Sequence, residues 1–169
     1  PHFISSMTAG HKKGDEINQL LAKAAAEMGW LFCVGSQKKE LQNKQSSKSW
    51  EKIVKNHPQV KFVSNIGIEE VIQYPINQIL DLTRPINSIG IIIHLNPLQE
   101  VFQNKTDVYM KGSLKAIADL VKKSSVPVIV KEVGFGISQD VSQSLFDVGV
   151  SVVDVSGSGG THWGMVEVL

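Results

Sequence analysis

The sequence alternates short apolar runs with segments whose apolar residues recur at helical spacing, and this alternation constrains the fold most strongly. Residues 89–93 form the most aliphatic run, as expected of a strand that is buried on both faces of a parallel sheet. Parallel neighbours need crossover connections, so the alternation predicts an α/β fold of repeated βαβ units. The predicted strands are 3–7, 31–34, 61–64, 89–93, 127–130 and 152–155, and the polar stretch 38–49 predicts an exposed loop.

Each predicted strand is followed by a polar residue at or just beyond its carboxyl end. Two architectures use such residues: a doubly wound open sheet and a (β/α)8 barrel. The length of 169 residues favours the open sheet, because a barrel normally needs about 250 residues. The placement of the polar residues favours the barrel, whose active site is assembled from many strand ends. These residues are Thr8, Ser36, Asn65, His94, Lys131 and Thr161.

The composition excludes several classes of protein. The formal net charge is +1, so no global field attracts nucleic acid or a membrane surface. The longest apolar stretch has the length of a strand and cannot cross a bilayer. Cys33 is the single cysteine and forms no internal disulfide, which is consistent with a cytoplasmic location. The sequence has no zinc-ligand spacing, no P-loop and no nucleophile elbow, which argues against covalent hydrolase chemistry.

The densest group of chemically active residues follows the most apolar run. His94, Asn96, Gln99 and Glu100 lie within seven positions there, which a solvated loop alone does not require. Lys131 directly follows another apolar run, where an ammonium group can face an anion or an electron-rich ring. Two glycine-bearing loops, 134–136 and 157–160, allow a ligand to approach the backbone or simply form tight turns.

Six motifs occur in an order and spacing that resemble a known family. They are Phe-Ile-Ser-Ser-Met-Thr-Ala-Gly at 3–10, Val-Gly-Ser-Gln at 34–37, Ser-Asn-Ile-Gly at 64–67, His-Leu-Asn-Pro-Leu-Gln-Glu at 94–100, and the segments 127–136 and 154–163. Together they resemble type 2 isopentenyl-diphosphate isomerase. The resemblance implies an FMN-dependent (β/α)8 barrel that interconverts isopentenyl and dimethylallyl diphosphate in isoprenoid biosynthesis, with Mg²⁺ and with NADPH as the flavin reductant.

The resemblance implies a domain organisation and a set of site residues. Residues 1–169 would be the central part of a single FMN-binding barrel, with about six βα units. The amino-terminal substrate segment and the last two βα units would be absent from it. The catalytic group would be His94, Asn96 and Gln99, and Glu100 would bind Mg²⁺. The FMN residues would be Ser5, Ser6, Met7, Thr8, Ser36, Asn65, Lys131 and Thr161, and the substrate residues Ser36, Gln37, Lys38, His94, Asn96 and Gln99.

Two positions depart from the family pattern. Gln103 to Asp107 replace a Pro-Glu-Gly segment, and Lys38 replaces an arginine, which keeps the charge but loses the bidentate fork. These departures leave open a degenerate or truncated, non-catalytic paralogue that acts as an interaction module. A separate alternative keeps the flavin on a related barrel but makes the protein an FMN-dependent 2-hydroxy-acid oxidase, and the set His94, Asn96, Gln99 and Glu100 argues against it. The expected partners are the two diphosphates and further copies of the chain, with no nucleic acid and no membrane.

Overall fold

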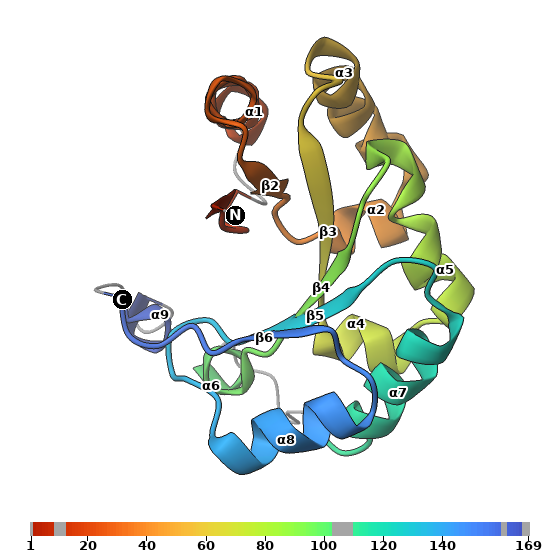
Figure 1. Ribbon diagram of the computed structural model, residues 1–169, viewed down its shortest axis with the longest axis vertical. Coiled ribbons are helices and arrows are strands. Elements are labelled where there is room, and N and C mark those ends of the chain that lie inside the picture. The colour runs from red at the N-terminus through yellow and green to blue at the C-terminus, as the bar shows by residue number, and fades with distance from the viewer. Residues whose placement is uncertain (1, 9–12, 103–109, 160–161, 167–169) are drawn as a thin grey trace. The chain divides into compact units, whose positions relative to one another are not determined.

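The computed structural model describes residues 2–8, 13–102, 110–159 and 162–166. Strands and helices alternate along the chain, which confirms the predicted α/β class (Figure 1). Within one sheet the strands follow their order in the sequence, and pairing is parallel between β1 and β2, β2 and β3, and β5 and β6. The strands are β1 (Phe3–Ile4), β2 (Leu31–Cys33), β3 (Lys61–Gly67), β4 (Ile91–His94), β5 (Val128–Lys131) and β6 (Val152–Asp154).

The expected (β/α)8 barrel is wrong for this structure. Strands β1 and β6 stand at the two ends of the strand order, so the sheet formed by the described residues is open and has six strands. Polar residues at the carboxyl ends of strands did not distinguish the architectures, because open parallel sheets also bind ligands there.

The described residues form two compact units. The first unit comprises Pro1–Ile66 and Asn77–Ile92, and the second comprises Gly67–Ile76 and Ile93–Leu169. In the first unit, Phe32 packs edge-on against Trp50 and at a tilt against Phe62, and all three rings are buried. The helices of the first unit are α1 (Gly14–Met28), α2 (Lys38–Gln42), η1 (Lys44–Ser47), α3 (Lys48–Asn56), most of α5 (Ile76–Asp81) and η2 (Arg84–Ile86).

The predicted exposed loop at 38–49 is wrong, because this stretch is helical. It contains α2, η1 and the start of α3. Asn43 ends α2 and its side-chain oxygen accepts a hydrogen bond from the Gln45 backbone N–H, which caps η1. Trp50 and Ile53 then bury one face of α3 in the core. The apolar anchors lie mainly beyond the polar stretch, so the local composition concealed the helix.

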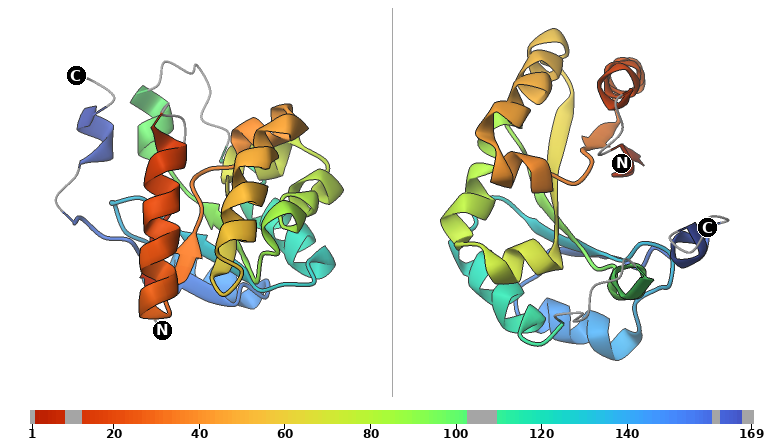
Figure 2. Two further views of the ribbon diagram at one scale, coloured as in Figure 1. Left: turned by 90° about the horizontal axis from the view of Figure 1, so that it is seen from above. Right: turned by 180° about the vertical axis from the view of Figure 1, so that it is seen from behind.

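The second unit packs its helices with one another and with β6. Helix α4 contacts α7, and α8 contacts β6. Figure 2 gives two further views of these helices. Gly67 ends β3 and α4 follows at once, while Ser138 caps α8 by accepting a hydrogen bond from the Val141 N–H. The helices are α4 (Ile68–Gln73), α6 (Pro97–Phe102), α7 (Ser113–Lys123), α8 (Gln139–Asp147) and α9 (Trp163–Val166).

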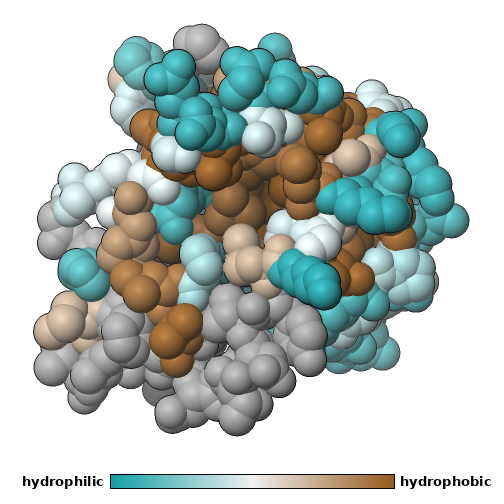
Figure 3. Space-filling model, turned by 90° about the horizontal axis from the view of Figure 1, so that it is seen from below, coloured by the Kyte–Doolittle hydropathy of each residue, from teal (hydrophilic) through white to brown (hydrophobic). Residues whose placement is uncertain are grey.

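No described helix has both the length and the apolar character needed to cross a bilayer. Hydrophobic side chains are nevertheless exposed on the surface, as the brown areas in Figure 3 show. Leu20 and Met28 on α1 belong to this exposed set, as do Phe146 on α8 and Val152 on β6.

Candidate active site

The second unit buries four polar side chains at and beyond the carboxyl ends of its strands. Their exposed fractions are 5% for Glu70, 8% for Asn96, 7% for Lys131 and 4% for Glu132. Three of the four carry ionisable groups. Burying a charge is costly unless other groups stabilise it, so such clusters are typical of functional sites. We therefore build the candidate active site from these residues.

Lys131 is the buried cation of this cluster. Its Nζ donates a hydrogen bond of 2.6 Å to the backbone oxygen of Glu132, and its own backbone oxygen accepts one of 2.7 Å from the Leu95 N–H. Lys131 pairs in register with Asp154 on β6. The ammonium group is thus held beside the last residues of β5, in the place where the sequence predicted a cation at a strand end.

Glu132 organises the loop that follows β5, although sequence reasoning assigned it no role. Its Oε2 accepts hydrogen bonds from three successive backbone N–H groups, those of Val133, Gly134 and Phe135, at 2.7, 2.9 and 2.7 Å. Gly134 and Gly136 have φ values of 140° and 84°, which favour glycine. A glutamate that follows a buried strand and precedes Gly-x-Gly is the signal that could have identified it.

His94 lies beside Gly67 and Glu70, which come from the preceding strand and helix. A Cβ atom placed on Gly67 would collide with Glu70 Oε2 and would lie 3.2 Å from His94 Nε2. The carboxylate and the imidazole therefore crowd the same point of the backbone. Sequence reasoning found His94 and missed Glu70, because no spacing rule connects a residue in α4 with the end of β4.

The rest of the predicted catalytic group lies only partly within the described residues. Asn96 is buried, and it lies in the short segment that connects β4 to α6. Gln99 and Glu100 belong to α6, but their side chains lie outside the described residues, as do Thr161 and the departing segment at 103–107. Among the residues whose positions are described, no group of three or more His, Cys, Asp or Glu side chains could hold a metal. Magnesium binding by Glu100 therefore stays a prediction.

In the first unit, Gln37 connects three backbone segments. Its side-chain Oε1 accepts a hydrogen bond from the Asn65 N–H at 3.2 Å, and its Nε2 donates one of 3.1 Å to the Leu82 carbonyl. Its backbone N–H also donates to the Asn65 carbonyl at 2.9 Å. The side chain is 1% exposed, so the amide holds the end of β2 against β3. Ser36 beside it is half-buried, and Lys38 begins α2.

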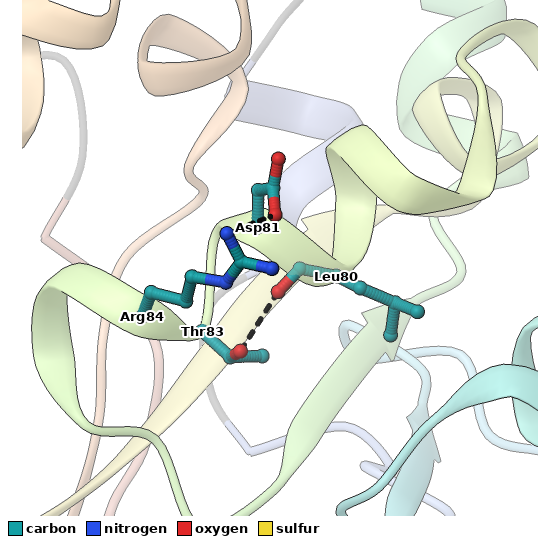
Figure 4. Close-up of polar contacts among 4 residues, drawn as sticks. All are labelled: Leu80, Asp81, Thr83 and Arg84. Atoms are coloured by element: carbon teal, nitrogen blue, oxygen red, sulfur yellow. Dashed lines mark hydrogen bonds and ion pairs between the residues drawn. The ribbon is translucent and has the colours of Figure 1, made fainter.

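The carbonyl that Gln37 binds lies in a turn after α5 that has contacts of its own. Thr83 Oγ1 donates a hydrogen bond of 2.7 Å to the Leu80 carbonyl, and Arg84 forms an ion pair of 3.1 Å with Asp81 (Figure 4). The Leu82 N–H donates to the Ile79 carbonyl at 3.2 Å. These local bonds fix the turn, so the Leu82 carbonyl is held in place for the Gln37 amide.

The residues after β1 provide one observation that bears on a cofactor. The Oγ atom of Ser6 is buried and has no hydrogen-bond partner within the described part of the chain. Buried hydroxyl groups are rarely left unpaired, so this atom fits a hydrogen bond to a bound group. Thr8 Oγ1 is hydrogen-bonded to Asn18 Oδ1 of α1, Ser5 is exposed, and Met7 is 57% exposed.

Curated relatives match almost the whole chain. The Bdellovibrio bacteriovorus protein is 46% identical over 167 residues, which cover 99% of this chain and 48% of the relative, and it is named isopentenyl-diphosphate delta-isomerase. The chain is similar to isopentenyl-diphosphate delta-isomerases. Proteins of that name from Legionella pneumophila strain Lens and Metallosphaera sedula are 45% and 35% identical. These alignments cover 99% and 100% of this chain but 49% and 47% of the relatives, so the chain spans about half of their length.

Other comparisons bear on the fold alone. No family model matches the chain. The Amycolatopsis orientalis BexX/CysO complex has a chain that superposes with a TM-score of 0.50 at 13% identity, over 83% of this chain and 52% of that chain. Rhizobium etli pyruvate carboxylase with acetyl coenzyme A gives a TM-score of 0.52 at 13% identity, over 83% of this chain and 13% of that chain. Likeness at this identity supports a shared arrangement of elements and no shared chemistry.

Proposed function

We propose that this chain forms part of an isomerase that interconverts isopentenyl and dimethylallyl diphosphate. The observation that carries the proposal is 46% identity, across nearly the whole chain, to a protein named for this activity. The buried polar cluster of the second unit supplies groups suited to such a reaction. It combines a cation, two carboxylates and an amide at the ends of strands, where α/β proteins bind ligands.

We further propose that the isomerase is of the FMN-dependent type 2, with NADPH as the flavin reductant. Reduced FMN would supply the group that transfers protons to and from the alkene. The buried, unpartnered Oγ of Ser6 supports a hydrogen bond to the cofactor from the first unit. The buried ammonium group of Lys131 supports stabilisation of negative charge on a reduced flavin ring.

The chain's own residues would then bind and orient the substrate. His94 and Asn96 would lie at the diphosphate, and Gln99 would position the alkene. Glu100 would hold Mg²⁺, a hard cation that prefers oxygen ligands and often binds carboxylates together with phosphates. Lys38 would contribute a single positive charge. A cytoplasmic location and a homo-oligomeric state remain predictions.

A chimera tests the proposal directly. The 169 residues would replace the matching half of the Bdellovibrio isomerase, and conversion of isopentenyl diphosphate would be followed by proton NMR with FMN, Mg²⁺ and NADPH present. The chain alone would be assayed in parallel, with the unaltered relative as the positive control. Conversion by the chimera supports the proposal.

Three other outcomes would count against it. A folded chimera that binds FMN but converts no diphosphate contradicts the isomerase proposal and favours a non-catalytic module. Oxidation of 2-hydroxy acids without isomerisation favours the oxidase instead. Isomerisation that persists when FMN is left out of cofactor-free protein contradicts the flavin part of the proposal alone.

A further inference from the structure

At Gly67 the space available, rather than the backbone conformation, makes the absence of a side chain important. Its φ and ψ are −75° and 153°, which any residue adopts without strain. A side chain there would nevertheless overlap the Glu70 carboxylate and press on the His94 ring at Nε2 and Cε1, at 3.2 and 3.5 Å. The glycine therefore leaves room for two polar side chains to approach the same backbone atom.

Burying the Glu70 carboxylate at this point costs folding free energy. It is 5% exposed, and it occupies the first turn of α4. The half-buried His94 comes from the end of β4, so the two side chains approach Gly67 from different elements of the second unit. A buried carboxylate is kept where its charge or its hydrogen bonds act on a neighbouring group. The neighbour that the geometry identifies is the imidazole of His94.

We propose that Glu70 is a positioning residue for His94: its carboxylate fixes the orientation of the imidazole and keeps a proton on Nε2. The hydrogen bond that one ring nitrogen makes determines which nitrogen carries the proton in a neutral imidazole. When the proton is on Nε2 and points towards Glu70, Nδ1 is the hydrogen-bond acceptor of the neutral ring. The importance of this arrangement for catalysis rests on the proposed function, whereas the arrangement itself does not.

Nitrogen NMR of the histidine rings tests the arrangement without any activity assay. The 169-residue chain would be labelled with ¹⁵N, and the signals of His94 would be assigned by their loss in His94→Asn. We expect a protonated Nε2 in the unaltered chain. In Glu70→Ala the His94 signals should move to the averaged position of two exchanging tautomers. Glu70→Gln keeps an acceptor oxygen and should restore the single tautomer.

Glu69→Gln is the matched control, because Glu69 lies on the same helix and binds Gln73 instead. It should leave the His94 signals unchanged. Two results would overturn the proposal: averaged tautomers or a proton on Nδ1 in the unaltered chain, or His94 signals that do not change in a folded Glu70→Ala. The first result does not depend on a Glu70 variant, so the test holds even if Glu70→Ala fails to fold.

The isomerase chimera then separates this inference from the proposed function. There, Glu70→Ala should lower kcat/KM about tenfold, as removal of a partner that orients a functional histidine commonly does, and Glu70→Gln should recover most of the loss. An inactive chimera whose His94 signals behave as expected rejects the isomerase and leaves the positioning role intact. An active chimera that is unaffected by Glu70→Ala rejects the role of this arrangement in catalysis.

Discussion

Two strand ends that look alike in the sequence are built differently in the structure. After β2, the neutral amide of Gln37 binds the backbone of Asn65 and Leu82 on either side. After β5, the ionisable pair Lys131 and Glu132 is buried, and Glu132 Oε2 alone accepts three backbone N–H groups. The first arrangement joins segments of backbone, and the second places charges inside the protein.

This difference shows what a polar residue at a strand end can do. A neutral amide satisfies buried backbone groups at low cost, so it is enough where the task is to connect strands. A buried carboxylate is more expensive, but its hydrogen bonds are roughly twice as strong as neutral ones. Charges are therefore expected where the loop must be held firmly beside a reacting centre, as we propose for the second unit.

The largest expected effect is the loss of the Glu132 carboxylate. Glu132→Ala leaves three backbone N–H groups without their partner, and we expect a loss of about 3 kcal/mol in the free energy of unfolding. Urea unfolding followed by circular dichroism measures it. Lys122→Ala, at an exposed position of α7, is the control and should change stability very little. A Glu132→Ala variant as stable as this control would show that the loop does not depend on the carboxylate.

Gln37→Ala should cost less, about 2 kcal/mol, because it removes two neutral hydrogen bonds and leaves the Asn65 N–H and the Leu82 carbonyl without that partner. The same unfolding experiment applies, with the exposed Gln42→Ala as its control. If Gln37→Ala proves costlier than Glu132→Ala, the contrast between neutral and charged networks is wrong.

The pH dependence of stability offers a smaller effect in the first unit. Desolvation by burial raises the pKa of Glu40 above 4.5, against the opposing hydrogen bonds from the Glu40 backbone and the Trp50 side chain. The folded protein then binds more protons than the unfolded chain. The contribution of protonated Glu40 to the free energy of unfolding is therefore fully present below about pH 4.5 and is lost as pH rises through the folded pKa.

Glutamine cannot ionise, so Glu40→Gln should remove the loss of stability that accompanies ionisation of Glu40. The variant should therefore be more stable than the unaltered protein at neutral pH. Thermal unfolding measured from about pH 4 to about pH 8 checks this expectation, because the range runs from the ordinary carboxylate pKa to just above neutrality. The exposed Glu51→Gln is the control. Identical pH profiles for the two variants would contradict the assignment to Glu40.

The smallest effect is expected on the exposed face of α7. Lys115 donates a hydrogen bond of 2.6 Å to Asp119, which lowers the pKa of the Asp119 carboxyl below its ordinary value of 3.8. The stabilisation of the folded protein by the ionised Asp119 carboxylate is present above pH 3.8 and is lost as pH falls through the folded pKa. Asp119→Asn should barely change the melting temperature at pH 7, because exposed pairs are screened by water and salt. A large drop would show that this pair is not a simple surface contact.

The sequence predicted the α/β class and the positions of the strands because apolar runs and helical spacing are local signals. It did not predict the open sheet, since polar residues such as His94 and Lys131 are placed alike in open sheets and barrels. The helices at 38–49 were missed because Trp50 and Ile53 supply much of their core contact from farther along the chain.

The candidate site was predictable where residues follow strands directly and not where tertiary contacts decide. His94, Asn96 and Lys131 were predicted in this way; the structure buries Asn96 and Lys131, and the roles of all three stay predictions. Glu70 was missed because it meets His94 only through the crowding around Gly67. The binding role predicted for Gln37 is untested, and its amide is occupied by backbone groups.

The most direct test of the central claim is the effect of Lys131→Met on dimethylallyl diphosphate formation by the chimera with the Bdellovibrio isomerase. If the buried cluster is the active site, this variant should lose about 100-fold in rate while remaining folded, as loss of a charge-stabilising group does. Lys122→Met, at an exposed position of α7, should keep the full rate. Equal rates in the two variants, or no conversion by the unaltered chimera, would contradict the account.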